Sequence, residues 1–417
     1  MNGFSRRAGA TGWRRAALAI ALLLAAAFAA APAGAAEPQG VARASVGTPV
    51  AAAQLLMKQK KYRQAAARLR QAEAVHGKTA YETYVVEETR AALALDTGDD
   101  KAAETALDAV LATGILPPAE ARKRLATLTE IASRAKDYKA VLAYARRYEE
   151  AGGSDREPPL LSGEAAYQTG DFAAASRILR GVVATDAKAG RPTPEDTLLL
   201  LAGSAYRSRD TAGYVDALTL LVAAYPKKSY WSDVLAAVPH LPGFADRLTL
   251  DLDRLRIATG VMEQPADYMA AAELALQEGL PGEAERMLAE GAAGGVFGQG
   301  PAAERATRLA AMARREAQQD LAALPGQARE ATADPRGETW ARLGERYAGQ
   351  GSFAEAAAAL RKALQLGGLT HPGETRLHLA IALLRAGRKG EAADAFRAVQ
   401  GAGTAVLARL WLIAGGV

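Results

Sequence analysis

The chain has 417 residues, of which 50% are hydrophobic and 23% charged, and it contains no cysteine. The missing cysteine excludes disulfides, thiolate metal sites, a cysteine nucleophile and a lipidated cysteine. The formal net charge is +5, but four arginines lie in residues 1–35, and the rest of the chain carries 47 basic against 46 acidic residues. A nearly neutral chain without a long run of one sign gives no support to a nucleic-acid partner.

The first 35 residues have the pattern of a cleavable export signal. Arginines precede an uncharged Leu/Ala-rich run over residues 16–31, and residues 33–35 supply the small side chains of a cleavage site. A retained membrane anchor is the alternative, but this run is shorter than the roughly 18–20 residues that span a bilayer. We therefore expect cleavage near Ala35, a periplasmic location and no stable membrane span in the mature protein.

Residues 36–50 contain Gly and Pro without apolar periodicity, which predicts a flexible leader. From residue 51 onward, helical patterning recurs, and a turn signature of the form Gly/Lys-x-aromatic-x-x-Ala divides it into helix pairs. The turn residues of the first five pairs are Lys60, Gly98, Lys136, Gly170 and Arg209, the last pair being degenerate. This spacing predicts an N-terminal repeat array over residues 51–240.

The middle of the chain, residues 243–335, is less regular. Its pattern predicts a helix from Phe244 to about Thr259, a repeat turn at Gly279, a glycine-rich loop, and a long polar helix over residues 302–324. Residues 336–417 then restore a pair of repeats, with turns at Gly351 and Gly387. The apolar segment 406–413 would cap the open end of the last repeat.

The first of these C-terminal repeats carries the most specific motif. Trp340, Leu343, Gly344 and Tyr347 form the W-x2-L-G-x2-Y pattern, which resembles the 34-residue tetratricopeptide repeat. The resemblance covers most of residues 51–400 and implies an all-α fold, a right-handed superhelical α-solenoid of helix–turn–helix repeats. More narrowly, segments such as YPKKSYW at 225–231 are similar to exported proteobacterial repeat proteins whose biochemical role is not established.

The repeat pattern also assigns core positions. Small residues are expected where two helices cross, and large ones between helices, so we interpret Trp340 as a core residue and not as a ligand-stacking aromatic. The predicted repeat core consists of Trp340, Leu343, Gly344, Tyr347, Phe353 and Ala356, with Gly163, Gly170, Phe172 and Ala175 in the fourth repeat.

No pattern in the sequence predicts catalysis. Phosphate-binding loops, H-E-x-x-H, G-x-S-x-G and C-x2-C motifs are absent, and no cofactor or metal is implied. His371 and His378 are seven residues apart and could share a helix face, but His371 precedes Pro372 in an expected loop. We therefore expect solvated or capping histidines there, and no enzyme.

The resemblance implies a concave groove lined by the first helix of each repeat. The candidate groove residues are Glu130, Arg134, Glu164, Tyr167, Gln168, Tyr206, Arg207, Glu345 and Arg385. A carboxylate clamp of Lys or Arg with Asn is disfavoured because the only asparagine is Asn2, in the export signal. We expect a protein or peptide partner held by mixed polar and apolar contacts.

Three functions fit these observations. The first is a periplasmic scaffold or adaptor for a protein partner in the cell envelope. The second is an accessory subunit of an energised, TonB- or Tol-like envelope transport system. The third is a cell-wall-acting enzyme, which would need an unrecognised acid in residues 244–335.

Overall fold

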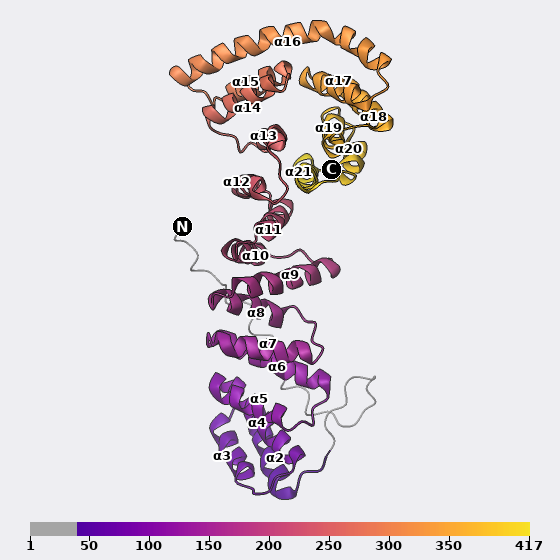
Figure 1. Ribbon diagram of the computed structural model, residues 1–417. Helices are drawn as coiled ribbons and strands as arrows, with labels where there is room; N and C mark the ends of the chain where they lie inside the picture. The colour runs from indigo at the N-terminus through magenta and orange to yellow at the C-terminus, as the bar shows by residue number, and fades with distance from the viewer. Residues whose placement is uncertain (1–39) are drawn as a thin grey trace. The chain divides into compact units, whose positions relative to one another are not determined.

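The computed structural model describes residues 40–417, and this part of the chain contains helices and no strand (Figure 1). The expected export signal and the start of the expected leader lie outside the described residues. The chain divides into two compact units, unit 1 ending at Arg191 and unit 2 spanning Pro192–Val417. The boundary expected at 240–243 therefore falls within unit 2.

Unit 1 is a succession of four helix–turn–helix pairs, in which the second helix of each pair also packs on the first helix of the next. The pairs are α2 (Ala44–Lys58) with α3 (Tyr62–Glu73), α4 (Ala80–Thr97) with α5 (Asp100–Ala112), α6 (Pro118–Arg134) with α7 (Tyr138–Glu150), and α8 (Glu157–Gln168) with α9 (Phe172–Lys188). Each pair buries its apolar face against a neighbour, as repeat arrays do.

Residues 44–50 are helical, and the prediction of a flexible leader is wrong for them. They form the first half of α2, where Val46 is fully buried and Val50 is 5% exposed in a cluster with side chains of α3 and α4. Pro49 removes one backbone hydrogen bond inside this helix. The burial of the two valines outweighs the loss of this hydrogen bond. The Gly and Pro residues on which the leader prediction rested give no information about packing against α3 and α4.

The repeat turns share one backbone geometry. Among the described residues, the non-glycine residues with positive φ are Lys60, Lys136 and Arg209, at 58–60°. Glycines with positive φ occupy the equivalent position in the other repeats, namely Gly98, Gly170, Gly279, Gly351 and Gly387. A left-handed residue ends the first helix of each pair and reverses the chain, so the turns lie where the sequence predicted them.

Unit 2 continues the pairing but includes irregular elements. Its first half consists of α10 (Glu195–Arg207), α11 (Thr211–Ala224), α12 (Lys228–Ala237), the 3-10 helices η1 (Val238–His240) and η2 (Asp246–Leu248), α13 (Thr249–Ala258), α14 (Pro265–Gln277) and α15 (Pro281–Ala293). Its second half consists of α16 (Pro301–Ala333), α17 (Gly337–Gly349), α18 (Phe353–Leu366), α19 (Pro372–Arg385), α20 (Lys389–Arg397) and α21 (Ala402–Gly415). The 33-residue helix α16 packs on α14, α15 and α17. The single helix expected from Phe244 is divided into η2 and α13.

The last helix of unit 2 closes the unit on itself (Figure 1). Helix α21 packs on α19 and α20, as a cap would, and also on α11 and α13 from the start of the unit. Arg409 of α21 donates from Nη2 to Oδ1 of Asp216 at 2.8 Å. A Cβ at Gly403 would lie 2.6 Å from Cδ1 of Leu248, so the helices approach closely here. The segment expected to cap the last repeat therefore also connects α19 and α20 with α11 and α13 from the start of the unit.

The residues predicted to form the repeat core differ in how deeply they are buried. Leu343, Gly344, Ala356, Gly163 and Ala175 are buried, whereas Trp340, Tyr347, Phe353 and Phe172 are half-buried. Trp340 packs beside Leu324 and Ala331 of α16. Gly170 is not a core residue, because it is exposed in a turn where its φ of 83° favours glycine.

Gly344 marks the closest crossing of α17 and α18. A Cβ there would lie 2.6 Å from Cγ of Leu360 and 3.2 Å from the Leu360 backbone nitrogen. We expect Gly344→Ala to lower the free energy of unfolding by about 1–3 kcal/mol through overpacking, measured by urea denaturation. Gly326→Ala in α16 is the matched control, because its Cβ would meet no atom within 4 Å. Similar losses from both substitutions would contradict this account.

Candidate functional site

Unit 2 contains a cavity of about 390 Å³ lined by side chains of α13, α15, α17, α18, α19 and α21. Its apolar lining includes Ile257, Met287, Phe353, Ile381 and Trp411. Its charged lining consists of three arginines, three glutamates and one histidine. A cavity of this size that combines apolar walls with a few polar groups is typical of a ligand site.

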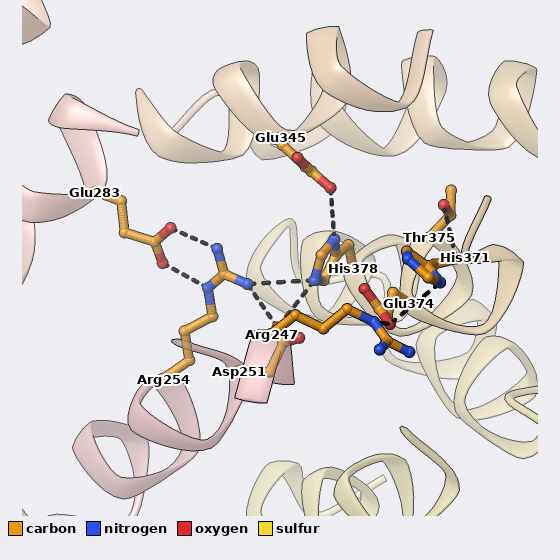
Figure 2. A network of polar contacts seen from close by, with 9 residues as sticks. All are labelled: Arg247, Asp251, Arg254, Glu283, Glu345, His371, Glu374, Thr375 and His378. Atoms are coloured by element: carbon orange, nitrogen blue, oxygen red, sulfur yellow. Dashed lines mark hydrogen bonds and ion pairs between the residues drawn. The ribbon is translucent and has the colours of Figure 1, made fainter. Parts of the chain in front are cut away.

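One wall of the cavity is an ion-pair network centred on Arg254 of α13 (Figure 2). Its guanidinium forms a bidentate pair with Glu283 of α15, from Nε to Oε1 and from Nη2 to Oε2, both at 2.7 Å. Its Nη1 donates to Oδ1 of Asp251 at 2.6 Å. Burial alone would lower the pKa of Arg254, but the two carboxylates raise it. This arginine is therefore a fixed cation.

His378 of α19 lies between two carboxylates (Figure 2). Its Nε2 is 2.9 Å from Oδ1 of Asp251 and its Nδ1 is 3.0 Å from Oε1 of Glu345. Ionised carboxylates only accept hydrogen bonds, so both ring nitrogens must donate, and the ring is an imidazolium. Burial would lower the pKa of His378, but Asp251 and Glu345 raise it to about 10. The contact of 3.3 Å between its Nε2 and Nη1 of Arg254 therefore joins two donors that share one carboxylate oxygen.

The pKa values of the carboxylates in the network are shifted downward. Burial would raise the pKa of Asp251, but His378 and Arg254 lower it to about 2. The pKa of Glu283 is also lowered, by Arg254 against the effect of burial. The network joins α13, α15, α17 and α19 through residues up to 127 positions apart in the sequence.

Two further arginines line the cavity without a carboxylate partner. Arg286 of α15 donates from Nη1 to the carbonyl oxygens of Ala348, at 2.9 Å, and Gly349, which end α17. Its guanidinium lies 5.5 Å from the centre of the Phe353 ring. Burial lowers its pKa, and the neighbouring Arg385 and Arg254 add to this effect while Glu283 opposes it. Within residues 40–417, neither Arg286 nor the exposed Arg385 forms an ion pair.

Unit 1 carries a separate acidic face on α6 and α8. Burial raises the pKa of Glu130 on α6 and of Glu164 on α8, and the nearby Glu157 raises both further. Glu164 is itself exposed at the surface. Glu130, Glu157 and Glu164 thus form a group of like charges on this face.

The nearest cations of unit 1 are tied to other carboxylates. Arg134 makes a bidentate contact with Asp100 at 2.6 and 2.9 Å. Arg156 lies 3.0 Å from both carboxylate oxygens of the buried Asp186. From these positions Arg134 lowers the pKa of Glu130 and Arg156 lowers that of Glu164, but in each case the raising effect of burial and Glu157 is larger.

No family model and no curated protein matches the chain. Solved structures do match, at 10–14% identity. They include the TPR2AB-domain:pHSP90-complex of yeast Sti1, with 10% identity, a TM-score of 0.24 and coverage of 71% of this chain and 99% of the other. Naa15/Naa10 bound to HypK-THB matches with 14% identity, a TM-score of 0.29 and coverage of 86% of this chain and 64% of the other. The APC/C hetero-tetramer Cut9–Hcn1 matches with 12% identity, a TM-score of 0.24 and coverage of 79% of this chain and 66% of the other. The chain thus spans about two thirds of the length of the latter two.

The architecture is established by the chain's own helices and not by these distant matches. Sequential helix pairs, each reversed by a left-handed residue at a recurring position, are present in both units. The fold is a tetratricopeptide-like α-solenoid. Each predicted groove residue can be placed on this tetratricopeptide-like frame.

The predicted groove residues are divided between the two units. Glu345 and Arg385 line the cavity of unit 2. Tyr206 and Arg207 lie on α10 of the same unit but outside the lining, and Tyr206 is 62% exposed beside Tyr214, with ring centroids 5.3 Å apart. The remaining candidates belong to α6 and α8 of unit 1, namely Glu130, Arg134, Glu164, Tyr167 and Gln168.

Sequence reasoning missed most of the cavity. His378 was expected to be solvated or to cap a helix, but its side chain is 15% exposed and lies between carboxylates from α13 and α17. His371 does lie before α19 and is exposed. A signal for the network was present in α13, where Asp251 and Arg254 alternate with apolar residues on more than one face of the helix. Charges in such a helix need partners from elsewhere in the fold.

Within residues 40–417, no group of three or more His, Asp or Glu side chains is arranged to hold a metal ion. The same residues include no helix whose length and apolar character would let it cross a membrane.

Proposed function

We propose that the protein is a tetratricopeptide-like scaffold that binds a protein or peptide partner in the periplasm and performs no catalysis. The export signal expected in residues 1–35 supports the location. The observation that carries the binding proposal is the acidic face of unit 1, formed by Glu130 on α6 and by Glu157 and Glu164 on α8.

The acidic face favours a partner segment that carries Lys or Arg. Mutual repulsion and desolvation disfavour the ionised forms of Glu130 and Glu164, so a cation placed among them relieves both effects. The half-buried Tyr167 ring of α8 lies beside Phe172, with ring centroids 5.3 Å apart, and adds apolar contact area. Complementary charge of this kind gives specificity and a faster association.

The polar network of unit 2 supports a structural role in preference to a catalytic one. A general base needs a nitrogen or oxygen that is free to accept a proton. Both ring nitrogens of His378 donate to carboxylates, and Asp251 and Glu283 accept from Arg254. Each group is thus engaged in holding helices together.

Crosslinking capture from an envelope extract tests the scaffold proposal. The bait is the exported chain from residue 36 onward, as wild type and as the double variant Glu130→Gln/Glu164→Gln. Glu149→Gln/Glu150→Gln on α7 is the control, because it removes the same charge from exposed positions outside the face. We expect the wild type and the control to capture the same partner and the face variant to lose it. Capture of no specific partner, or equal capture by all three baits, would overturn the proposal.

A further inference from the structure

We infer that the cavity of unit 2 binds a small organic acid, whose carboxylate pairs with Arg286 and Arg385 and whose apolar body lies among Met287, Phe353 and Ile381. This is a second site, in the other unit from the acidic face and with the opposite charge preference. The inference therefore stands independently of the proposed protein partner.

Two cations of the lining have no carboxylate partner. Arg254 and His378 pair with Asp251, Glu283 and Glu345 within the network. Of the remaining lining residues, Arg286 and Arg385 are cations that form no ion pair among the described residues, and Glu290 is the only anion. A carboxylate placed at these two arginines would supply the missing partner.

Arg286 is positioned to receive a carboxylate. Its Nη1 donates to the carbonyls that end α17, which fixes the guanidinium plane. Its Nε and Nη2 have no hydrogen-bond acceptor among the described residues, and neither atom is sealed from the cavity. The N–H groups on this edge of a guanidinium are parallel and match the two oxygens of a carboxylate. Arg385 lies close enough to lower the pKa of Arg286, and a bound anion would remove that repulsion.

The size of the cavity suits a small molecule. Its volume of about 390 Å³ lies within the roughly 300–1,000 Å³ of small-molecule sites. A medium-chain or aryl-substituted carboxylate fits the volume and the apolar lining together.

Isothermal titration calorimetry on the chain from residue 36 onward tests this site. The probes are octanoate and 3-phenylpropionate, with 1-octanol and octylamine as neutral and cationic counterparts. We expect saturable binding of at least one acid with a stoichiometry of one, and at least 10-fold weaker binding of both counterparts. Equal binding of octanol and octanoate, or no binding of either acid at millimolar concentration, would overturn the inference.

Variants of the two arginines locate the carboxylate. Arg385→Met should weaken acid binding about 10-fold, and Arg286→Lys should weaken it by at least as much because lysine cannot bind bidentately. Arg376→Met on the same helix as Arg385 is the control, since Arg376 does not line the cavity. Equal affinity of Arg385→Met and Arg376→Met would contradict the assignment. A peptide acid ending in leucine that binds, when its amide and the free acids do not, would replace the small acid as occupant and overturn our choice.

Discussion

Arg254→Met should lower the free energy of unfolding of unit 2 by about 3–5 kcal/mol, the usual cost of removing one partner from a buried ion pair. The substitution keeps an apolar stem of similar length but leaves Glu283 without its bidentate donor and Asp251 Oδ1 with His378 as its one remaining donor. Equilibrium denaturation in urea, followed by far-UV circular dichroism, measures the loss.

Arg397→Met on α20 is the matched control in the same unit. Arg397 pairs with Asp394 at 3.0 Å, and the two side chains are 63% and 82% exposed. Exposed pairs contribute about 0–1 kcal/mol, so this variant should unfold near the wild type. If the two variants lost stability equally, the network around Arg254 would not be the structural centre of unit 2.

His378→Leu should destabilise the protein by about 3 kcal/mol near pH 6, and the difference from wild type should shrink as the pH rises. Because the folded-state pKa of His378 is raised to about 10 from an ordinary value of 6.5, the protonated ring stabilises the fold fully below pH 6.5. That contribution is lost between pH 6.5 and pH 10. Asp251, with its pKa lowered to about 2, stays ionised throughout this range.

Urea denaturation of wild type and variant at pH 6, 8 and 10 measures this dependence. His371→Leu is the control, because His371 is exposed and lies 4.0 Å from its nearest carboxylate, that of Glu374. We expect its stability to follow the wild type at each pH. A constant difference between His378→Leu and wild type from pH 6 to pH 10 would show that the ring acts through packing and not through its charge.

The repeats could be predicted from the sequence because their determinants are local. A left-handed residue followed by a capping aspartate, as at Lys136 and Asp137, needs only neighbouring residues to form its turn. The same reasoning assigned small residues to the helix crossings, where Gly344 and Gly163 have Leu360 and Leu179 against their backbones. Local rules of this kind are sufficient for the helix pairs.

The cavity could not be predicted because its contacts are not local. His378 meets Glu345, 33 residues away, and Asp251, 127 residues away. The recurring turn signature aligns equivalent positions of the repeats, but it does not show that α21 packs on α11 and α13. That closure places Trp411 of α21 at the cavity that the groove candidates Glu345 and Arg385 line.

The return of α21 also bears on how unit 2 loses its structure. An open array of repeats frays from its ends, because a terminal repeat is held from one side only. Helix α21 is held both by its sequence neighbours and by helices formed some 150 to 200 residues earlier. Its release therefore exposes two surfaces at once, so unit 2 is built to open in one cooperative step, whereas unit 1 can melt repeat by repeat.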